Sequence, residues 1–186
     1  MSKFSGALAR RYGTALYETL VKTSETKEIF QKQAKQIAII SFYCTKKIIH
    51  NFALPSLTNE DTIKIFDFFL SQILKDNEIS PQLHSFLKLI LINNRVMDIK
   101  PILKFFLVKA DEYLGIAHAT LISARPIKES DVQEFGTSLE TVLKKRVIFK
   151  TEIDESLKSG FVVKIGHMKI DSSFKTRLNG LKELFI

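Results

Sequence analysis

The side chains that could carry out chemistry are few and widely separated in this sequence. His50, His84, His118 and His167 form no H-E-x-x-H motif, and the single cysteine, Cys44, has no second cysteine with which to share a metal. Neither G-x-x-x-x-G-K-[ST] nor G-x-G-x-x-G occurs, and seven glycines leave little material for phosphate-binding loops. Cys44 also lacks neighbours that would activate a thiol. We therefore expect no enzyme activity, no metal and no cofactor.

The composition predicts a folded protein without a membrane span. Hydrophobic residues make up 45% of the 186 residues, and no long apolar run free of charge is present. The start of the chain carries Lys3, Arg10 and Arg11 but no apolar segment typical of a secretory signal, so we expect a mature N-terminus. A lone cysteine excludes an internal disulfide and fits a reducing compartment.

The formal net charge of +8 leaves the kind of partner open, and its excess lies mainly within residues 1–105. A basic surface can meet nucleic acid, anionic lipid or an acidic protein, or it can simply be solvated. A nucleic-acid-binding protein would use residues 144–146 with Lys150, or Arg10 and Arg11 with Lys3. However, the phenylalanines follow apolar helical stripes and form no base-stacking pattern. A membrane-surface protein is a third alternative.

Hydrophobic periodicity predicts a series of helices in the first part of the chain. We expect helices at about 5–22, from a cap at Ser24 through Ile40, at 48–52, after a cap at Thr58, after Ser80-Pro81 and at 98–114. Short connections between them predict an antiparallel six-helix bundle over residues 1–105, with the long helix 98–114 as the connector to the second domain.

Residues 106–186 predict a small mixed β-sheet with helices, so that the fold class is α+β. Strands are expected at 116–124 and 147–153, on either side of a helix opened by a capping box of Ser130 and Gln133. A hairpin of 161–165 and 168–170 would turn at Gly166, with the glycine at positive φ. Asp171 or Ser172 would then cap a terminal helix with apolar residues at helical spacing.

Four segments, in order, carry a family resemblance. They are Ala9–Leu16 (A-R-R-Y-G-T-A-L), Phe86–Arg95 (F-L-K-L-I-L-I-N-N-R), Ala119–Ile127 (A-T-L-I-S-A-R-P-I) and Asp154–Leu178. Together they resemble the delta subunit of F-type ATP synthases, a relative of the mitochondrial oligomycin-sensitivity-conferring protein. The chain departs from the family pattern where Gly13 replaces an alanine, where Asp154-Glu155 replaces Asp-Pro, and at Lys158-Ser159-Gly160.

The resemblance implies a non-catalytic stator subunit of the peripheral stalk. Such a subunit links the alpha/beta catalytic head to the membrane-anchored b subunits during proton-driven ATP synthesis and binds no nucleotide. Its N-terminal bundle would bind N-terminal helices of the alpha subunits, and its C-terminal domain would bind C-terminal helices of the b subunits. One copy would belong to a hetero-oligomeric complex at the cytoplasmic side of a bacterial inner membrane, as a peripheral membrane protein.

The resemblance also implies a groove for the alpha subunit between the first and fifth helices. Mapped onto this sequence, its residues are Tyr12, Ala15, Leu16, Phe86, Ile90 and Asn94. The alternative is that these side chains fill the core of the bundle.

Four further residues receive roles outside this groove. Arg177 is either a contact for the b subunit or a solubilising charge on the terminal helix. Arg95, Gly166 and Asp171 are expected to be structural, with Arg95 either capping a helix C-terminus or pairing with an acidic group between the domains.

Overall fold

The protein is an α+β chain whose contacts form two compact units. The computed structural model describes residues 3–52, 58–74, 78–154, 157, 161–166 and 168–171. The first unit spans residues 1–114 and the second 115–186. This division lies later than the expected boundary at 105/106, because the helix that ends at Leu114 packs with helices of the first unit.

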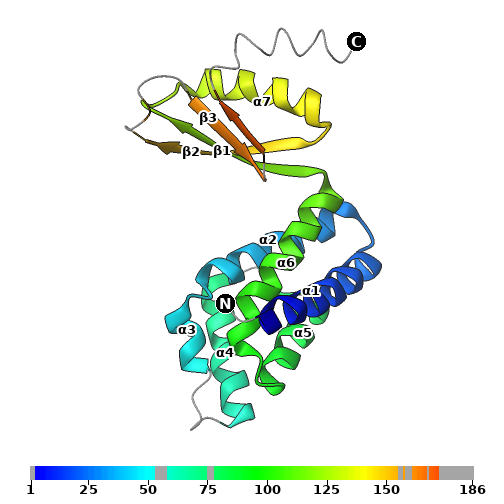
Figure 1. Ribbon diagram of the computed structural model, residues 1–186. Coiled ribbons are helices and arrows are strands. Elements are labelled where there is room, and N and C mark those ends of the chain that lie inside the picture. The colour runs from blue at the N-terminus through cyan, green and yellow to red at the C-terminus, as the bar shows by residue number, and fades with distance from the viewer. Residues whose placement is uncertain are drawn as a thin grey trace. The chain divides into compact units, whose positions relative to one another are not determined.

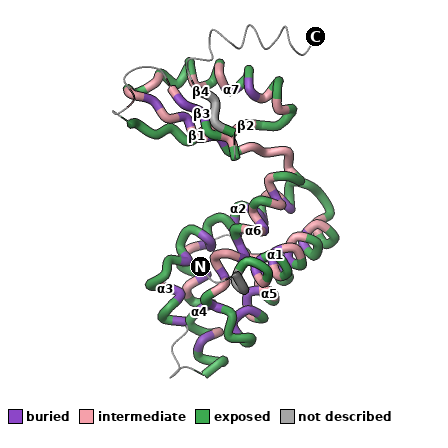
Figure 2. The backbone as a smooth tube through the Cα atoms, in the orientation of Figure 1, coloured by how far each residue is buried: buried purple, intermediate pink, exposed green. Residues whose placement is uncertain are grey.

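The first unit is helical, as the sequence predicts. Its described residues form α1 (Lys3–Thr23), α2 (Lys27–Tyr43), α3 (Lys46–Phe52), α4 (Asn59–Leu74), α5 (Pro81–Ile92) and α6 (Ile99–Leu114), with a 3-10 turn at Val96–Asp98 (Figure 1). Helix α6 packs against α1 and α2, while α5 packs against α1 and α4. Figure 2 shows the buried residues gathered where these helices meet. Phe30, Phe66 and Phe106 are the largest fully buried side chains.

Two of the expected helix caps are confirmed and one is wrong. The Thr58 hydroxyl accepts a hydrogen bond from the Asp61 amide at 3.2 Å, and the Ser80 hydroxyl accepts one from the Leu83 amide at 3.3 Å. Helix α2 is instead capped by Thr26, whose hydroxyl accepts a hydrogen bond from the Ile29 amide at 3.3 Å, while Ser24 donates its hydroxyl proton to Gln33 Oε1 at 3.0 Å. The side-chain partner of Ser24 lies on the helix it was expected to begin.

Helices α1 and α6 pack tightly against each other at Gly13, where the family pattern has alanine. A Cβ atom on Gly13 would lie 2.8 Å from Phe105 Cδ1 and 3.0 Å from the carbonyl oxygen of Ile102. Both distances are too short for normal van der Waals contact. The absence of a side chain at position 13 therefore sets how near the two helices lie.

The second unit is built on a mixed four-stranded sheet. Its elements are β1 (Ile116–Ser123), α7 (Glu129–Leu143), β2 (Arg146–Ile153), β3 (Phe161–Ile165) and β4 (Met168–Asp171). The strand order is β2-β1-β3-β4, with β1 parallel to β2 and antiparallel to β3. Because β1 and β2 run parallel, the chain crosses over between them through α7.

Helix α7 covers one face of this sheet (Figure 1). The Phe135 ring packs against Phe149 of β2 and Phe161 of β3, with centroid distances of 6.2 and 5.2 Å. The capping box expected at Ser130 and Gln133 is wrong, because α7 begins at Glu129 after Lys128, and the Ser130 hydroxyl bonds the Asp131 carboxylate.

The hairpin of β3 and β4 turns at Gly166, whose φ is +56°. This is the left-handed region, which glycine enters without steric cost. Asp171 ends β4 and pairs with Val162. The terminal helix that Asp171 was expected to cap, and Arg177 within it, lie outside the described residues.

Candidate partner-binding groove

An open groove runs between α1 and α5 on the helical unit. Its volume is about 460 Å³. The residues that line it come from the two helices and are mainly apolar or hydroxyl-bearing: Leu16, Thr19, Pro81, Gln82, Ser85, Phe86 and Leu89. A groove between two helices, with an apolar floor and few charges, is the kind of surface that accepts a third helix.

The aromatic pair Tyr12 and Phe86 joins the two helices beside this groove. Their ring centroids are 6.5 Å apart and the planes meet at 63°, an edge-to-face contact. Both side chains are half-buried, so each keeps an exposed part. Leu16 is buried and forms part of the floor, whereas Ala15 is exposed on the same helix.

Two of the expected groove residues lie elsewhere in the helical unit, one in its core and one at the end of α5. Ile90 is fully buried, at 0% exposure, and belongs to the bundle core, the alternative that periodicity left open. Asn94 has a φ of +53° and donates its amide proton to Leu91, while the Arg95 amide donates to Ile90 at 2.9 Å. These two bonds form a Schellman motif, which closes the C-terminus of α5. Arg95 thus caps the helix through its backbone, and its side chain is exposed.

Sequence reasoning missed several groove residues. Thr19, Gln82, Ser85 and Leu89 line the groove, and Leu89 is 48% exposed despite its size. Their signal was available, since Thr19 lies one turn beyond Ala15, and Gln82 and Ser85 precede Phe86 and Leu89 by one turn. What hid Leu89 is the nearly continuous apolar run of α5, in which no single face stands out.

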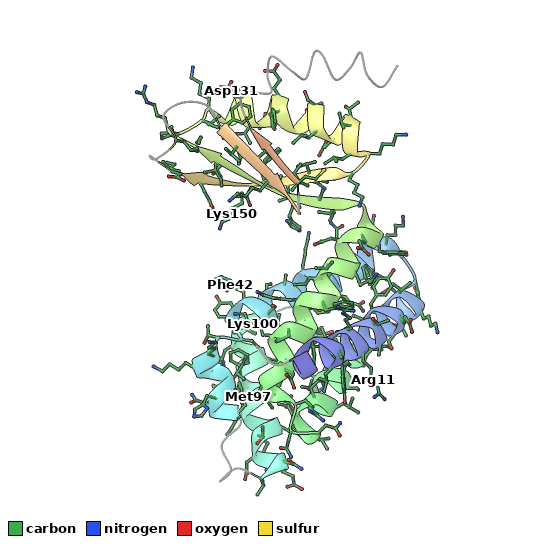
Figure 3. The ribbon with its side chains drawn as sticks, viewed as in Figure 1. Arg11, Phe42, Met97, Lys100, Asp131 and Lys150 are labelled. Carbon is green, nitrogen blue, oxygen red and sulfur yellow. The ribbon has the colours of Figure 1, made fainter. Side chains whose placement is uncertain are left out.

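Charged groups flank α5 and α1. Asp67 of α4 lies 2.8 Å from His84 Nε2 and 3.6 Å from Lys88 Nζ, measured from its two carboxylate oxygens. These contacts tie α4 to α5 on the side of α5 that does not line the groove. Arg11 is exposed on α1 and points outward from the bundle (Figure 3).

Metal ligands and a reactive thiol are two kinds of chemistry that the described residues could bring to a site. Among them, no three His, Cys, Asp or Glu side chains lie close enough to hold a metal ion. Burial raises the pKa of the Cys44 thiol to about 11, and the nearby charge of Lys100 only partly offsets this effect. A thiol with so high a pKa is protonated at neutral pH and is a poor nucleophile. Within the same described ranges, no helix has the length and apolarity that a membrane crossing requires.

Lys150 of β2, one of the basic residues considered for nucleic-acid binding, forms an ion pair with Glu152 of the same strand. Lys150 Nζ lies 2.8 Å from Glu152 Oε1, and this hydrogen bond raises the lysine pKa and lowers that of the glutamate. The pair lies on the surface, where such ion pairs contribute little to stability.

Comparison with known proteins gives consistent results over nearly the whole chain. The family model of the ATP synthase delta (OSCP) subunit matches residues 8–185. The ATP synthase subunit delta of Desulforapulum autotrophicum is 29% identical, over 96% of this chain and 94% of its own length. That of Geotalea uraniireducens is 28% identical, over 97% of both chains. None of these descriptions mentions nucleic acid, so the nucleic-acid-binding alternative gains no support.

A solved structure has the same fold. A chain in the cryo-EM structure of the Toxoplasma gondii mitochondrial ATP synthase hexamer matches with a TM-score of 0.61 and 13% identity. The match covers 96% of this chain and 97% of the other.

Proposed function

Because the chain belongs to the ATP synthase delta (OSCP) subunit family, we propose that the groove between α1 and α5 receives an N-terminal helix of the ATP synthase alpha subunit. The chain is a non-catalytic stator subunit of the peripheral stalk of an F-type ATP synthase. In that position it links the catalytic head to the membrane-anchored part of the stator during proton-driven ATP synthesis.

The groove itself is the observation that supports the proposed contact with the catalytic head. Tyr12 and Phe86 offer exposed aromatic edges, Leu16 supplies an apolar floor, and Leu89 adds a side chain that the bundle leaves uncovered. Amphipathic helices bind such grooves through apolar residues at i, i+3, i+4 and i+7. Ile90 and Asn94 then support the groove, as a core residue and a helix terminus, and do not contact the partner directly.

We assign the b-subunit contact to the second unit, in keeping with the family. This unit presents apolar side chains to solvent, among them Val142 of α7, Ile153 of β2 and Met168 of β4. Arg177 remains our candidate for a polar contact there. The subunit would be present in one copy and would lie at the cytoplasmic side of a bacterial inner membrane, since the delta subunits of Desulforapulum and Geotalea come from bacteria.

We also infer that α1 to α6 form an antiparallel six-helix bundle that acts as a domain of its own. The packing of α6 on α1 and α2 and of α5 on α1 and α4 supports this inference. The helical residues up to Leu114 would then bind the head, and the residues from Gly115 onward would bind the b subunits.

Titration calorimetry of the full chain with a peptide of its own alpha subunit's N-terminal helix tests the head contact. We expect binding with a negative heat-capacity change and weak dependence on salt, because burial of apolar surface would dominate. Ala15→Asp should weaken binding at least about tenfold, because the carboxylate would lose water against an apolar helix.

Ala38→Asp is the matched control, since Ala38 is equally an exposed alanine within a long helix but lies on α2. It should leave the affinity unchanged. Equal affinities for the wild type and both variants would mean that the alpha helix binds elsewhere. No heat at all, in a chain that remains folded by circular dichroism, would reject the head contact.

A further inference from the structure

A second exposed apolar surface lies at the C-terminal end of α2, away from the groove. Ile39, Phe42 and Tyr43 follow one another at i, i+3 and i+4 on the outward face of this helix. Phe42 is 76% exposed, the largest value among the exposed large hydrophobic residues, and Tyr43 is 45% exposed. Their rings meet edge-to-face with centroids 5.4 Å apart. We call these three residues the α2 corner.

The sequence on both sides of the α2 corner carries exposed lysines and no acidic residue. From Ile29 to Asn59 the chain contains no Asp and no Glu. Over the same stretch Lys35 precedes the corner on the exposed side of α2, and Lys46 and Lys47 follow it at the exposed start of α3. Lys100 of α6 also approaches this end of α2, because its charge acts on the Cys44 thiol. Figure 3 labels Phe42 and Lys100.

The apolar side chains of the α2 corner and the lysines near it indicate which kind of partner could bind there. Two aromatic rings and a β-branched side chain on one helical face can insert between apolar residues of another helix. Lysines on both sides of the strip complement carboxylates that flank such residues. The strip covers little more than one helical turn, whereas binding to a membrane surface needs an apolar face along most of a helix.

We propose that the α2 corner binds an acidic amphipathic helix of a protein partner. Phe42 is the apolar anchor, and Lys46 and Lys47 pair with carboxylates next to the residues that cover its ring. The site is separate from the groove between α1 and α5, so this proposal stands independently of the alpha-subunit contact. The small apolar area places the interaction among the weak or transient ones.

A designed peptide tests the proposal with the full chain. The probe is a fluorescein-labelled helix with leucine at i, i+3, i+4 and i+7 and glutamate at the remaining positions, followed by fluorescence anisotropy. Phe42→Ser should weaken binding about tenfold, since a central aromatic anchor commonly contributes that much. Lys46→Glu with Lys47→Glu should weaken it to a similar degree and remove most of its salt dependence.

Two controls separate this site from the rest of the surface. Phe68→Ser changes a phenylalanine of similar exposure, 66%, on α4, and it should not alter the affinity. Ala15→Asp places a carboxylate one turn before Thr19 of the groove and should weaken binding there, so binding that survives this change comes from another site. The proposal is overturned if Ala15→Asp abolishes binding, or if Phe42→Ser and Phe68→Ser behave alike. It is also overturned if phosphatidylglycerol vesicles bind through Phe42 while the peptide does not.

Discussion

Replacing Gly13 by alanine should destabilise the helical unit although alanine is the better helix former. In an isolated helix the change would gain up to about 1 kcal/mol. Here the new Cβ would meet Phe105 Cδ1 at 2.8 Å, Phe105 Cβ at 3.2 Å and the Ile102 carbonyl oxygen at 3.0 Å. The ring can rotate, but the carbonyl belongs to the backbone of α6 and moves only with the helix.

Overpacking of this kind costs about 1–3 kcal/mol, so the net loss should be about 1 kcal/mol. For a chain of this size that corresponds to a lowering of the thermal midpoint by about 3 °C. Gly6→Ala is the matched control on the same helix, because nothing lies within 4 Å of its Cβ. It should stabilise the chain by about 0.5 kcal/mol.

Urea denaturation followed by far-ultraviolet circular dichroism measures both changes, and amide exchange in α1 locates them. In a Phe105→Ala background Gly13→Ala should cost less, since part of the clash is removed. A Gly13→Ala variant that is stabilised as much as Gly6→Ala would refute the reasoning. It would mean that α1 and α6 can separate without loss of packing.

Three further predictions concern individual positions. Asn94→Gly should leave stability and alpha-peptide affinity nearly unchanged, because glycine accepts the positive φ of this position. Asn94→Val should lower the free energy of unfolding in urea by about 1–2 kcal/mol, because a β-branched residue does not. A loss of affinity in Asn94→Gly would instead make this residue a partner contact. Gly166→Ala should cost about 1 kcal/mol from backbone strain alone, since its Cβ would meet no atom within 4 Å, and a neutral result would contradict the turn conformation. The Cys44 pKa of about 11 lies above its ordinary value of 9.0, so the unfolded chain loses this proton first as pH rises. The free energy of unfolding should therefore fall between about pH 9 and 11. A Cys44→Ala variant should lack this pH dependence, and a pH profile identical to that of the wild type would show that the thiol does not contribute.

Local signals were sufficient for most of the fold. The strands at 116–123, 146–153 and 161–165 and the helices of the first unit follow from apolar periodicity, which burial on one face imposes directly. The caps at Thr58 and Ser80 were predictable because each hydroxyl bonds an amide three residues ahead. Ser24 and Ser130 carry the same local signal, but their hydroxyls bond Gln33 and Asp131 side chains instead. The two cap predictions fail because the helices begin elsewhere: α2 begins at Lys27 after a cap at Thr26, and Ser130 lies inside α7.

The groove was predictable only in part, because the second half of α5, from Phe86 to Ile92, is a nearly unbroken apolar run. Periodicity cannot decide whether Leu89 or Ile90 faces the core when both neighbours are apolar. The structure resolves this through packing against α1 and α4, which buries Ile90 and leaves Leu89 exposed in the groove. Tyr12 and Phe86 could be found because the family resemblance fixed their helices. Asn94, matched by the same resemblance, takes a position set by the helix terminus.

Gly13 shows why a departure from a family pattern needs a second residue to explain it. The sequence of α1 alone gives no reason for glycine in a helix interior, where it costs about 1 kcal/mol relative to alanine. The reason lies in α6, far along the chain, where Phe105 occupies the space that a methyl group would need. If this account is correct, relatives with alanine at the position of Gly13 should carry a residue smaller than phenylalanine at the position of Phe105. An alignment in which alanine and phenylalanine occur together at these positions as often as by chance would mean that the backbone of α6, and not its side chain, sets the helix spacing.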